Sequence, residues 1–207
     1  MTQSQKTSIC IILGTAHGAD VAGKCSPDKS LKEYQWSREI CTKVQKKLQE
    51  DGYRCVIDSL DTNEIGLSNR CTIVNNYCSY FKPSNCVYLS IHNNAAPPVD
   101  NQWHTAKGWS AFIAKTASEN SKKLSSLLYK EAEAAGLKMR RPRPKQDYWE
   151  ANYTVLTKTK CPAVLTENLF QDNKEDCKYL LSKNGKDTLV NIHVKALENY
   201  VNEIIVK

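Results

Sequence analysis

The chain alternates short apolar segments, rich in β-branched residues, with longer segments whose apolar residues recur at helical spacing. The segments predicted as strands are Ser8–Gly14, Tyr53–Ile57, Asn85–Ile91, Gly108–Ala114 and Cys161–Glu167. Helices are predicted over Ser30–Asp51, Ile65–Phe81, Ser118–Ala135, Asn173–Ser182 and Asp187–Ile204. Such alternation is typical of βαβ units, whose parallel strands form one sheet between layers of helices. We therefore predict one α/β domain over residues 1–207, with a largely parallel, twisted sheet and helices on both faces.

The composition indicates a globular domain rather than a membrane-spanning chain. Hydrophobic residues make up 41% of the chain and charged residues 25%. The longest clear apolar run, Ile9–Leu13, is far shorter than the ~18 residues of a membrane span. The polar segment Met1–Ser8 lacks the apolar stretch of a signal peptide. We therefore predict no integral membrane segment and synthesis in the cytoplasm without a signal peptide.

The chain is basic, with a formal net charge of +7. Such a charge favours anionic partners, whether nucleic acid, acidic lipid or an acidic wall polymer, without choosing among them. Five positive charges lie within Lys138–Lys145, which forms either a solvated loop or a rim that attracts an anionic substrate. Because no base-reading motif accompanies them, we predict no nucleic-acid binding.

Nine cysteines are spread along the chain without any CxxC pair. Zinc ribbons and thioredoxin-like sites need that close pairing, so both are disfavoured. We expect most of these cysteines to be reduced, small residues of the core.

Four residues capable of metal binding or acid–base chemistry lie at the carboxyl ends of predicted strands or just beyond. His17 follows the first strand, His92 closes the third, Glu167 closes a later one, and Glu33 opens the helix after the His17 loop. In α/β sheets, sites form at this edge. Two imidazoles and one carboxylate are a frequent catalytic zinc set that leaves a fourth position for water. Each residue alone also has a structural interpretation, such as a hydrogen-bonded histidine or a glutamate favoured by the helix dipole.

The other two histidines are weaker candidates. His104 lies in a proline-rich loop that follows His92 and is predicted to be exposed, at most at the rim of a cleft. His193 falls inside the last predicted helix and is interpreted as structural. Tyr148 and Trp149 follow the basic stretch and are interpreted as anchors or as a surface for a ligand.

The motifs around the four candidate residues resemble the zinc-dependent N-acetylmuramoyl-L-alanine amidases of the amidase-3 type. They read GTAHG at His17, SIHNNA at His92, AKGW from Ala106, and PAVLTEN at Glu167 followed by Phe170. The predicted helix that contains Arg70, Val74 and Asn75 also resembles a helix of that family. Two departures stand out: the first turn lacks the usual aspartate–proline–glycine opening, and ENLF replaces a motif in which a glycine follows the glutamate.

The resemblance implies a role for each candidate. It makes His17, Glu33 and His92 ligands of Zn²⁺ and Glu167 the catalytic carboxylate, with no other cofactor. The substrate it implies is peptidoglycan, cut between N-acetylmuramic acid and L-alanine in host-cell lysis or wall turnover. The whole chain is then one catalytic domain without a separate cell-wall-binding domain, and the enzyme acts on the wall after release, like a phage or prophage endolysin.

Two alternatives stay open at the level of sequence. One is another zinc-dependent peptidase or aminoacylase on the same scaffold, with the same site chemistry and a different substrate pocket. The other is a basic nucleic-acid-binding domain, which predicts steep salt dependence and no metal. The sequence does not specify an oligomeric state.

Overall fold

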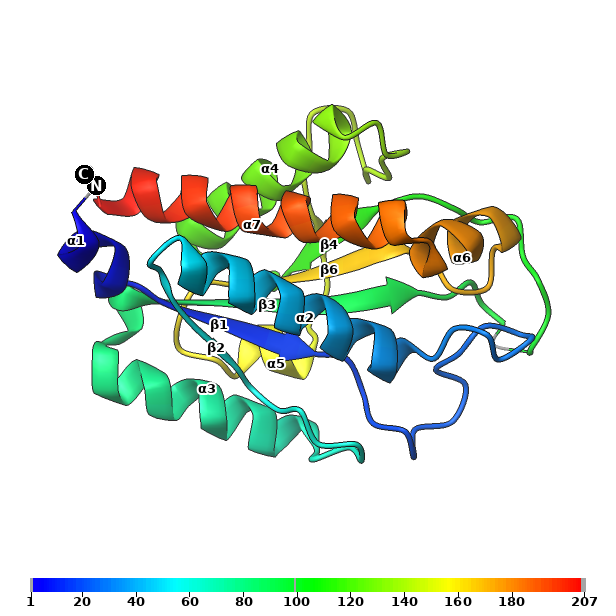
Figure 1. The fold of residues 1–207 in the computed structure, drawn as a ribbon, viewed down its shortest axis with the longest axis horizontal. Coiled ribbons are helices and arrows are strands. Elements are labelled where there is room, and N and C mark those ends of the chain that lie inside the picture. Colours follow the sequence, from blue (N-terminus) through cyan, green and yellow to red (C-terminus); the bar gives the residue numbers. More distant parts are fainter. Residues whose placement is uncertain (1, 99, 206–207) are drawn as a thin grey trace.

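A computed structural model describes residues 2–98 and 100–205, which build one six-stranded sheet (Figure 1). Its strands are β1 (Cys10–Thr15), β2 (Arg54–Ile57), β3 (Cys86–Asn94), β4 (Ser110–Ile113), β5 (Trp149–Glu150) and β6 (Ala163–Phe170). Their order across the sheet is β2-β1-β3-β6-β4-β5. All neighbouring pairs are parallel except β4 and β6, which are antiparallel. The predicted α/β fold with a largely parallel sheet is confirmed.

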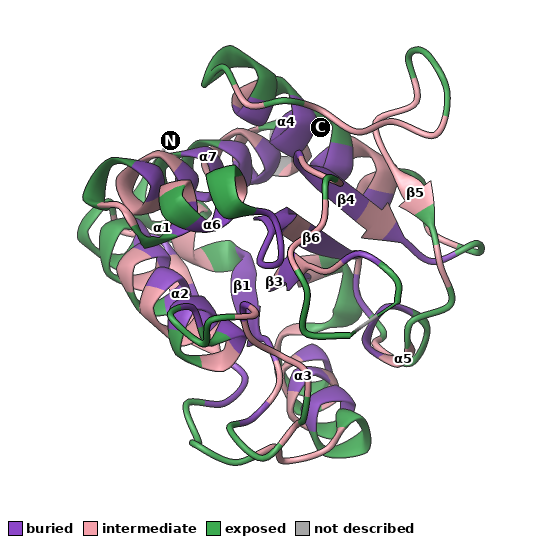
Figure 2. Cartoon of the chain, turned by 90° about the vertical axis from the view of Figure 1, so that its right-hand side faces the viewer, coloured by how far each residue is buried: buried purple, intermediate pink, exposed green. Residues whose placement is uncertain are grey.

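Helices cover both faces of the sheet, as predicted (Figure 1). One layer consists of α2 (Glu33–Glu50), α4 (Glu119–Ala134), α6 (Lys174–Leu181) and α7 (Lys183–Ile205). The other consists of α3 (Leu67–Phe81) and the single turn α5 (Thr154–Thr157). The central strands of the sheet and the inward faces of these helices are buried, while the outer faces of the helices and the edge strand β5 are more exposed (Figure 2).

Alternation of side chains along the strands divides the core into two clusters. On β1, Ile11 and Leu13 pack against the α2 and α7 layer, whereas Cys10 and Ile12 pack against the α3 layer. Successive side chains of a strand point to opposite faces, so a strand covered on both sides is expected to be mostly apolar. All six residues of β1 are buried.

The chain path places a crevice between β1 and β3. From β1 the chain crosses to β2 on one side, and it then returns to β3 on the other side of β1. This reversal of direction is a topological switch point, and ligands of open α/β sheets bind beyond the carboxyl ends of the strands at such a point. The loop after β1 and the end of β3 therefore border the predicted site.

The structure also contains short elements that the sequence pattern does not predict. They are α1 (Gln3–Ser8), the 3₁₀ turn η1 (Pro83–Asn85), β5 and α5. Each is too short to show a clear period. Helix α7 begins at Lys183, four residues before the predicted start, and β3 and β6 run three residues beyond their predicted ends.

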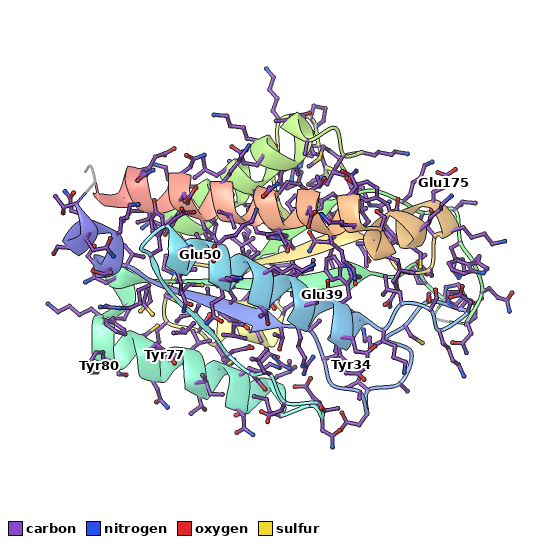
Figure 3. All side chains as sticks on the ribbon, viewed as in Figure 1. Tyr34, Glu39, Glu50, Tyr77, Tyr80 and Glu175 are labelled. Atoms are coloured by element: carbon purple, nitrogen blue, oxygen red, sulfur yellow. The ribbon has the colours of Figure 1, made fainter. Side chains whose placement is uncertain are left out.

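Charged side chains lie on the outer surface of the helices (Figure 3). Glu39 on α2 forms an ion pair with Lys186 on α7, with 2.7 Å between Oε2 and Nζ, and thus joins two helices of one layer. Among the described residues, no helix is long and apolar enough to cross a membrane.

Candidate metal centre and catalytic site

His17, Glu33 and His92 meet at the switch point. Glu33 Oε1 lies 3.1 Å from His92 Nδ1 and 3.7 Å from His17 Nε2. The two imidazole rings are 5.1 Å apart between centroids and nearly perpendicular. One donor atom from each residue falls within 4.8 Å of the other two, so the three residues together could hold a metal ion.

The donor set has the chemistry of a metal centre. Glu33 is 1% exposed, and its Oε2 has no hydrogen-bond partner within residues 2–98 and 100–205. An orphaned carboxylate oxygen in a buried position is costly unless a cation or donor satisfies it. Burial lowers the pKa of His17 to about 4. The charge of Glu33 acts in the opposite direction, whereas the charges of His92 and Lys24 lower the pKa further. His17 is therefore neutral near pH 7, which leaves a lone pair for a metal.

The start of α2 positions the Glu33 carboxylate. Glu33 is the first helical residue, and its backbone N–H donates to the carbonyl of Lys24 at 3.0 Å. Its Oε1 accepts a hydrogen bond from the backbone N–H of Asn93 at 3.1 Å. Burial opposes ionisation of Glu33, but the hydrogen bond and charge of His92 outweigh it and hold the pKa of Glu33 below its usual value. The carboxylate is thus fixed between α2 and the end of β3.

Two arginines hold the loop that carries His17. Arg38 donates to the carbonyls of Ala16 and His17 at 3.0 and 2.9 Å. Arg70 donates to the carbonyl of Thr15 at 2.6 Å, and its charge is balanced by Asp58 at 3.1 Å. His17 itself has a φ of 39°, an uncommon conformation for a residue other than glycine. The side chains of Arg38 on α2 and Arg70 on α3 thus hold the end of β1 and the residues that follow it.

Glu167 faces the metal candidates from the neighbouring strand. It pairs in register with His92 across the parallel strands β6 and β3. Its Oε2 is buried and has no hydrogen-bond partner among the described residues. Burial, followed by the charge of Glu33, raises the pKa of Glu167 well above its usual value, against the influence of Lys24. A buried carboxyl group with a raised pKa is a candidate for proton transfer at a site of this kind.

The segment after Glu167 keeps a backbone conformation that glycine favours, although the chain has no glycine there. Leu169 has a φ of 65°, and the register between β3 and β6 shifts next to it. The buried Asn168 stabilises this irregular stretch, because its amide donates to the carbonyl of His92 at 3.0 Å and accepts from the indole of Trp109 at 2.8 Å.

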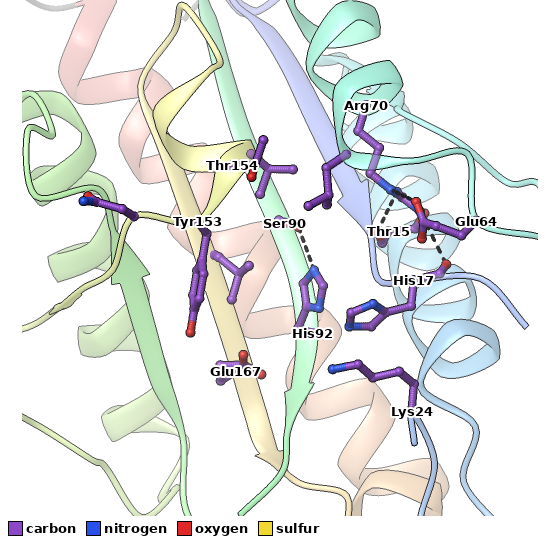
Figure 4. A pocket seen from close by; sticks show the side chains of 14 residues that line it. Thr15, His17, Lys24, Glu64, Arg70, Ser90, His92, Tyr153, Thr154 and Glu167 are labelled. Atoms are coloured by element: carbon purple, nitrogen blue, oxygen red, sulfur yellow. Dashed lines mark hydrogen bonds and ion pairs between the residues drawn. The ribbon is translucent and has the colours of Figure 1, made fainter. Parts of the chain in front are cut away.

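A cleft of about 370 Å³ lies beside three of the four predicted residues, and the buried Glu33 is outside its lining (Figure 4). His17, His92 and Glu167 line it together with residues that the sequence did not single out as candidates. These additional lining residues include Lys24, Glu64, Ser90 and Tyr153. Ser90 Oγ lies 3.0 Å from His92 Nε2, which gives the ring a second partner on the nitrogen facing away from Glu33. Such a partner orients a metal-binding histidine.

Tyr153 has no signal in the sequence pattern because it precedes the single turn α5. It is 40% exposed, and Figure 4 shows its hydroxyl directed toward Glu167. Burial, followed by the charge of Glu167, raises the pKa of Tyr153.

The weaker sequence candidates lie outside the residues that line this cleft. His193 is fully buried and bonds Leu189 and Thr166, in agreement with its structural interpretation. His104 is only partly buried and contacts Asp100 at 3.0 Å. In the basic stretch, Arg141 pairs with Glu133 and Asp147.

The two aromatic residues after the basic stretch are anchors in the fold. Trp149 stacks on Phe112 with 6.2 Å between ring centroids, and Tyr148 packs against the core.

Comparison with known proteins identifies the class to which this fold and site belong. The sequence model of the family Amidase_3, N-acetylmuramoyl-L-alanine amidase, matches residues 11–199. The chain therefore belongs to this family, which confirms the resemblance seen in its motifs.

One relative by sequence and two solved structures with the same fold resemble this chain. The endolysin of Bacillus phage SPP1 is 28% identical over 116 residues, which are 56% of this chain and 40% of the endolysin. The chain thus spans about two fifths of the length of that curated relative. The structure of N-acetylmuramoyl-L-alanine amidase from Clostridium difficile 630 superposes with a TM-score of 0.81 at 22% identity, over 95% of this chain and 98% of that one. The catalytic domain of CwlV, an amidase from Bacillus (Paenibacillus) polymyxa, gives 0.78 at 20% identity, over 94% and 98%.

Proposed function

We propose that this chain is the catalytic domain of a zinc-dependent amidase that hydrolyses the bond between N-acetylmuramic acid and L-alanine in peptidoglycan. The observation that carries this proposal is the convergence of His17, Glu33 and His92 in an amidase-family fold, with His17 and His92 lining the same cleft as Glu167. The proposal assigns the first three residues to Zn²⁺ and Glu167 to catalysis.

The ligand set supports zinc over harder cations. Two imidazole nitrogens and one carboxylate are typical ligands of catalytic zinc, whereas magnesium and calcium prefer oxygen ligands alone. Zinc held by these residues supplies Lewis acidity, which polarises a carbonyl and acidifies water.

Glu167 moves the proton in this scheme. Its carboxylate takes a proton from the attacking water and passes it to the nitrogen of the scissile amide as the carbon–nitrogen bond breaks. The second transfer is required because an unprotonated amine is a poor leaving group. Burial and the nearby Glu33 charge raise the pKa of Glu167, which brings the carboxyl group toward the pH at which both transfers occur.

The similarity to a phage endolysin supports a role in lysis. We propose that the enzyme acts on the cell wall after release from the cell that makes it. Peptidoglycan is the partner in this scheme, and the net charge of +7 favours contact with an acidic wall polymer.

Mass spectrometry of digested sacculi tests the proposal. Purified protein with zinc is expected to release free stem peptides that begin with L-alanine and to leave the glycan strands intact. Chelation should stop the release, and added zinc should restore it. Cleavage between amino acids would instead indicate a peptidase on the same scaffold, and cleavage between sugars would exclude amide hydrolysis as the activity.

A further inference from the structure

Lys24 is fixed in place by the same contact that positions Glu33. Its carbonyl accepts the backbone N–H of Glu33 at 3.0 Å, and the next residue, Cys25, forms a β-bridge with Lys32. The backbone of Lys24 is therefore tied to the first turn of α2. Its side chain extends from a fixed point beside a candidate metal ligand.

The ammonium group of Lys24 lies in the cleft rather than in an ion pair. Figure 4 shows the side chain below His17, directed toward the space between His17 and Glu167. Within residues 2–98 and 100–205, the one hydrogen bond of Lys24 is that of its backbone carbonyl with Glu33, and its ammonium has no hydrogen-bond or ion-pair partner. Its charge nevertheless reaches the site, because it lowers the pKa of His17, Glu33 and Glu167.

The positive charge of Lys24 disfavours a metal ion at the neighbouring residues, so metal binding does not explain why a lysine lies here. The ammonium repels any divalent cation held by His17, Glu33 and His92, and it receives no carboxylate partner of its own. A fixed positive charge is useful where negative charge develops during a reaction. Attack of water on an amide carbonyl creates such a charge on the carbonyl oxygen.

We propose that Lys24 is a further catalytic residue, whose ammonium donates a hydrogen bond to the carbonyl oxygen of the scissile amide as negative charge develops there. This inference rests on the proposed amidase function. The water oxygen bonds to the carbonyl carbon, its proton passes to Glu167, and the carbonyl π electrons move onto the oxygen that faces Lys24. When the carbonyl re-forms, the carbon–nitrogen bond breaks and the proton on Glu167 passes to the leaving nitrogen.

The test compares Lys24→Met with Lys32→Met. Lys32 is exposed on the same loop, so its replacement controls for loss of one positive charge near α2. Using sacculi or a soluble muramoyl-peptide, we expect Lys24→Met to lower kcat by about 10²–10³-fold, the usual cost of one oxyanion donor, while KM stays within about twofold. Lys32→Met should match the unmodified protein in both constants. A rise in KM with unchanged kcat, or kcat unaffected by Lys24→Met, would overturn the inference.

Zinc binding provides a second readout that does not depend on turnover. Removal of a nearby cation should leave the zinc dissociation constant unchanged or lower it, whereas loss of a structural anchor for Glu33 should raise it. Competition with a chromogenic chelator measures this constant, and Lys24→Gln repeats it with a polar side chain if Lys24→Met folds poorly. Weaker zinc binding in both variants would overturn the catalytic assignment. If the unmodified protein releases no stem peptide, the amidase proposal itself fails. If the unmodified protein is active and Lys24→Met turns over normally, only the inference about Lys24 fails.

Discussion

His92 and Glu167 are register partners on neighbouring parallel strands, β3 and β6. Because side chains at paired positions of parallel strands point to the same face, strand spacing sets the separation between the proposed ligand and the proposed proton carrier. Both residues lie within the central sheet rather than on loops. This arrangement fixes the relative positions of the two groups through the sheet.

Arg70 is predicted to be essential for stability. Its side chain is 3% exposed and forms ion pairs with Asp58 and Glu64, which become uncompensated when the guanidinium is removed. We expect Arg70→Met to lower the free energy of unfolding by about 3–5 kcal/mol, as is usual when one partner of a buried pair is lost.

Urea denaturation of Arg70→Met beside Arg141→Met measures this difference. Arg141 also bridges two acidic residues but is 24% exposed, so its loss should cost at most about 1 kcal/mol. Equal effects of the two substitutions would contradict the assignment of Arg70 as the centre of a buried network.

The buried His193 predicts a loss of stability in acid. Burial lowers its pKa to about 4, whereas the unfolded chain has a histidine pKa of about 6.5. Between these values the unfolded state binds a proton that the folded state does not, so stability falls as the pH drops from about 6.5 toward about 4. The loss at pH 4 amounts to about 3 kcal/mol relative to a variant without a titrating group.

Unfolding free energies of the unmodified protein and His193→Gln across this pH range measure the effect. As the pH falls, the unmodified protein should lose more of its free energy of unfolding than His193→Gln does. A difference that is constant from pH 7 to pH 4 would show that His193 does not titrate differently in the folded and unfolded states.

Thiol reactivity should single out Cys25. All nine cysteines are free, and eight of them are buried, whereas Cys25 is partly exposed. We expect a small disulfide reagent to modify about one thiol in the native protein and nine after unfolding in denaturant. The burst of released chromophore measures the number, and a peptide map locates the site. Rapid modification of two or more thiols under native conditions would show that the core opens more readily than its packing indicates.

Much of the fold follows from periodicity in the sequence. The strongly apolar β1 and the amphipathic α2 are long enough to show their periods, so both are predicted within a few residues of their observed bounds. The four-residue α5 and the two-residue β5 are too short to show a period and are not predicted. In the fold, α5 packs against α3 and β6, and β5 pairs with β4.

The candidate site is also predictable only in part from the sequence. His17, Glu33, His92 and Glu167 can be found because each lies at a strand end or helix start, where the topology of a parallel sheet brings side chains together. Lys24 and Tyr153 cannot be found in this way. They lie in irregular segments, and only the folded positions of the α2 loop and α5 direct them into the cleft.

The most direct test of the account measures zinc content and turnover together in Glu33→Gln and Glu167→Gln. If Glu33 binds the metal, its replacement by a neutral amide should lower zinc content and activity together. If Glu167 carries the proton, Glu167→Gln should keep about one zinc per chain and lose at least about 10²–10⁴-fold in turnover, the usual cost of a lost general base. A Glu167→Gln protein that loses its zinc, or that keeps near-normal turnover, would contradict the division of roles between the two glutamates.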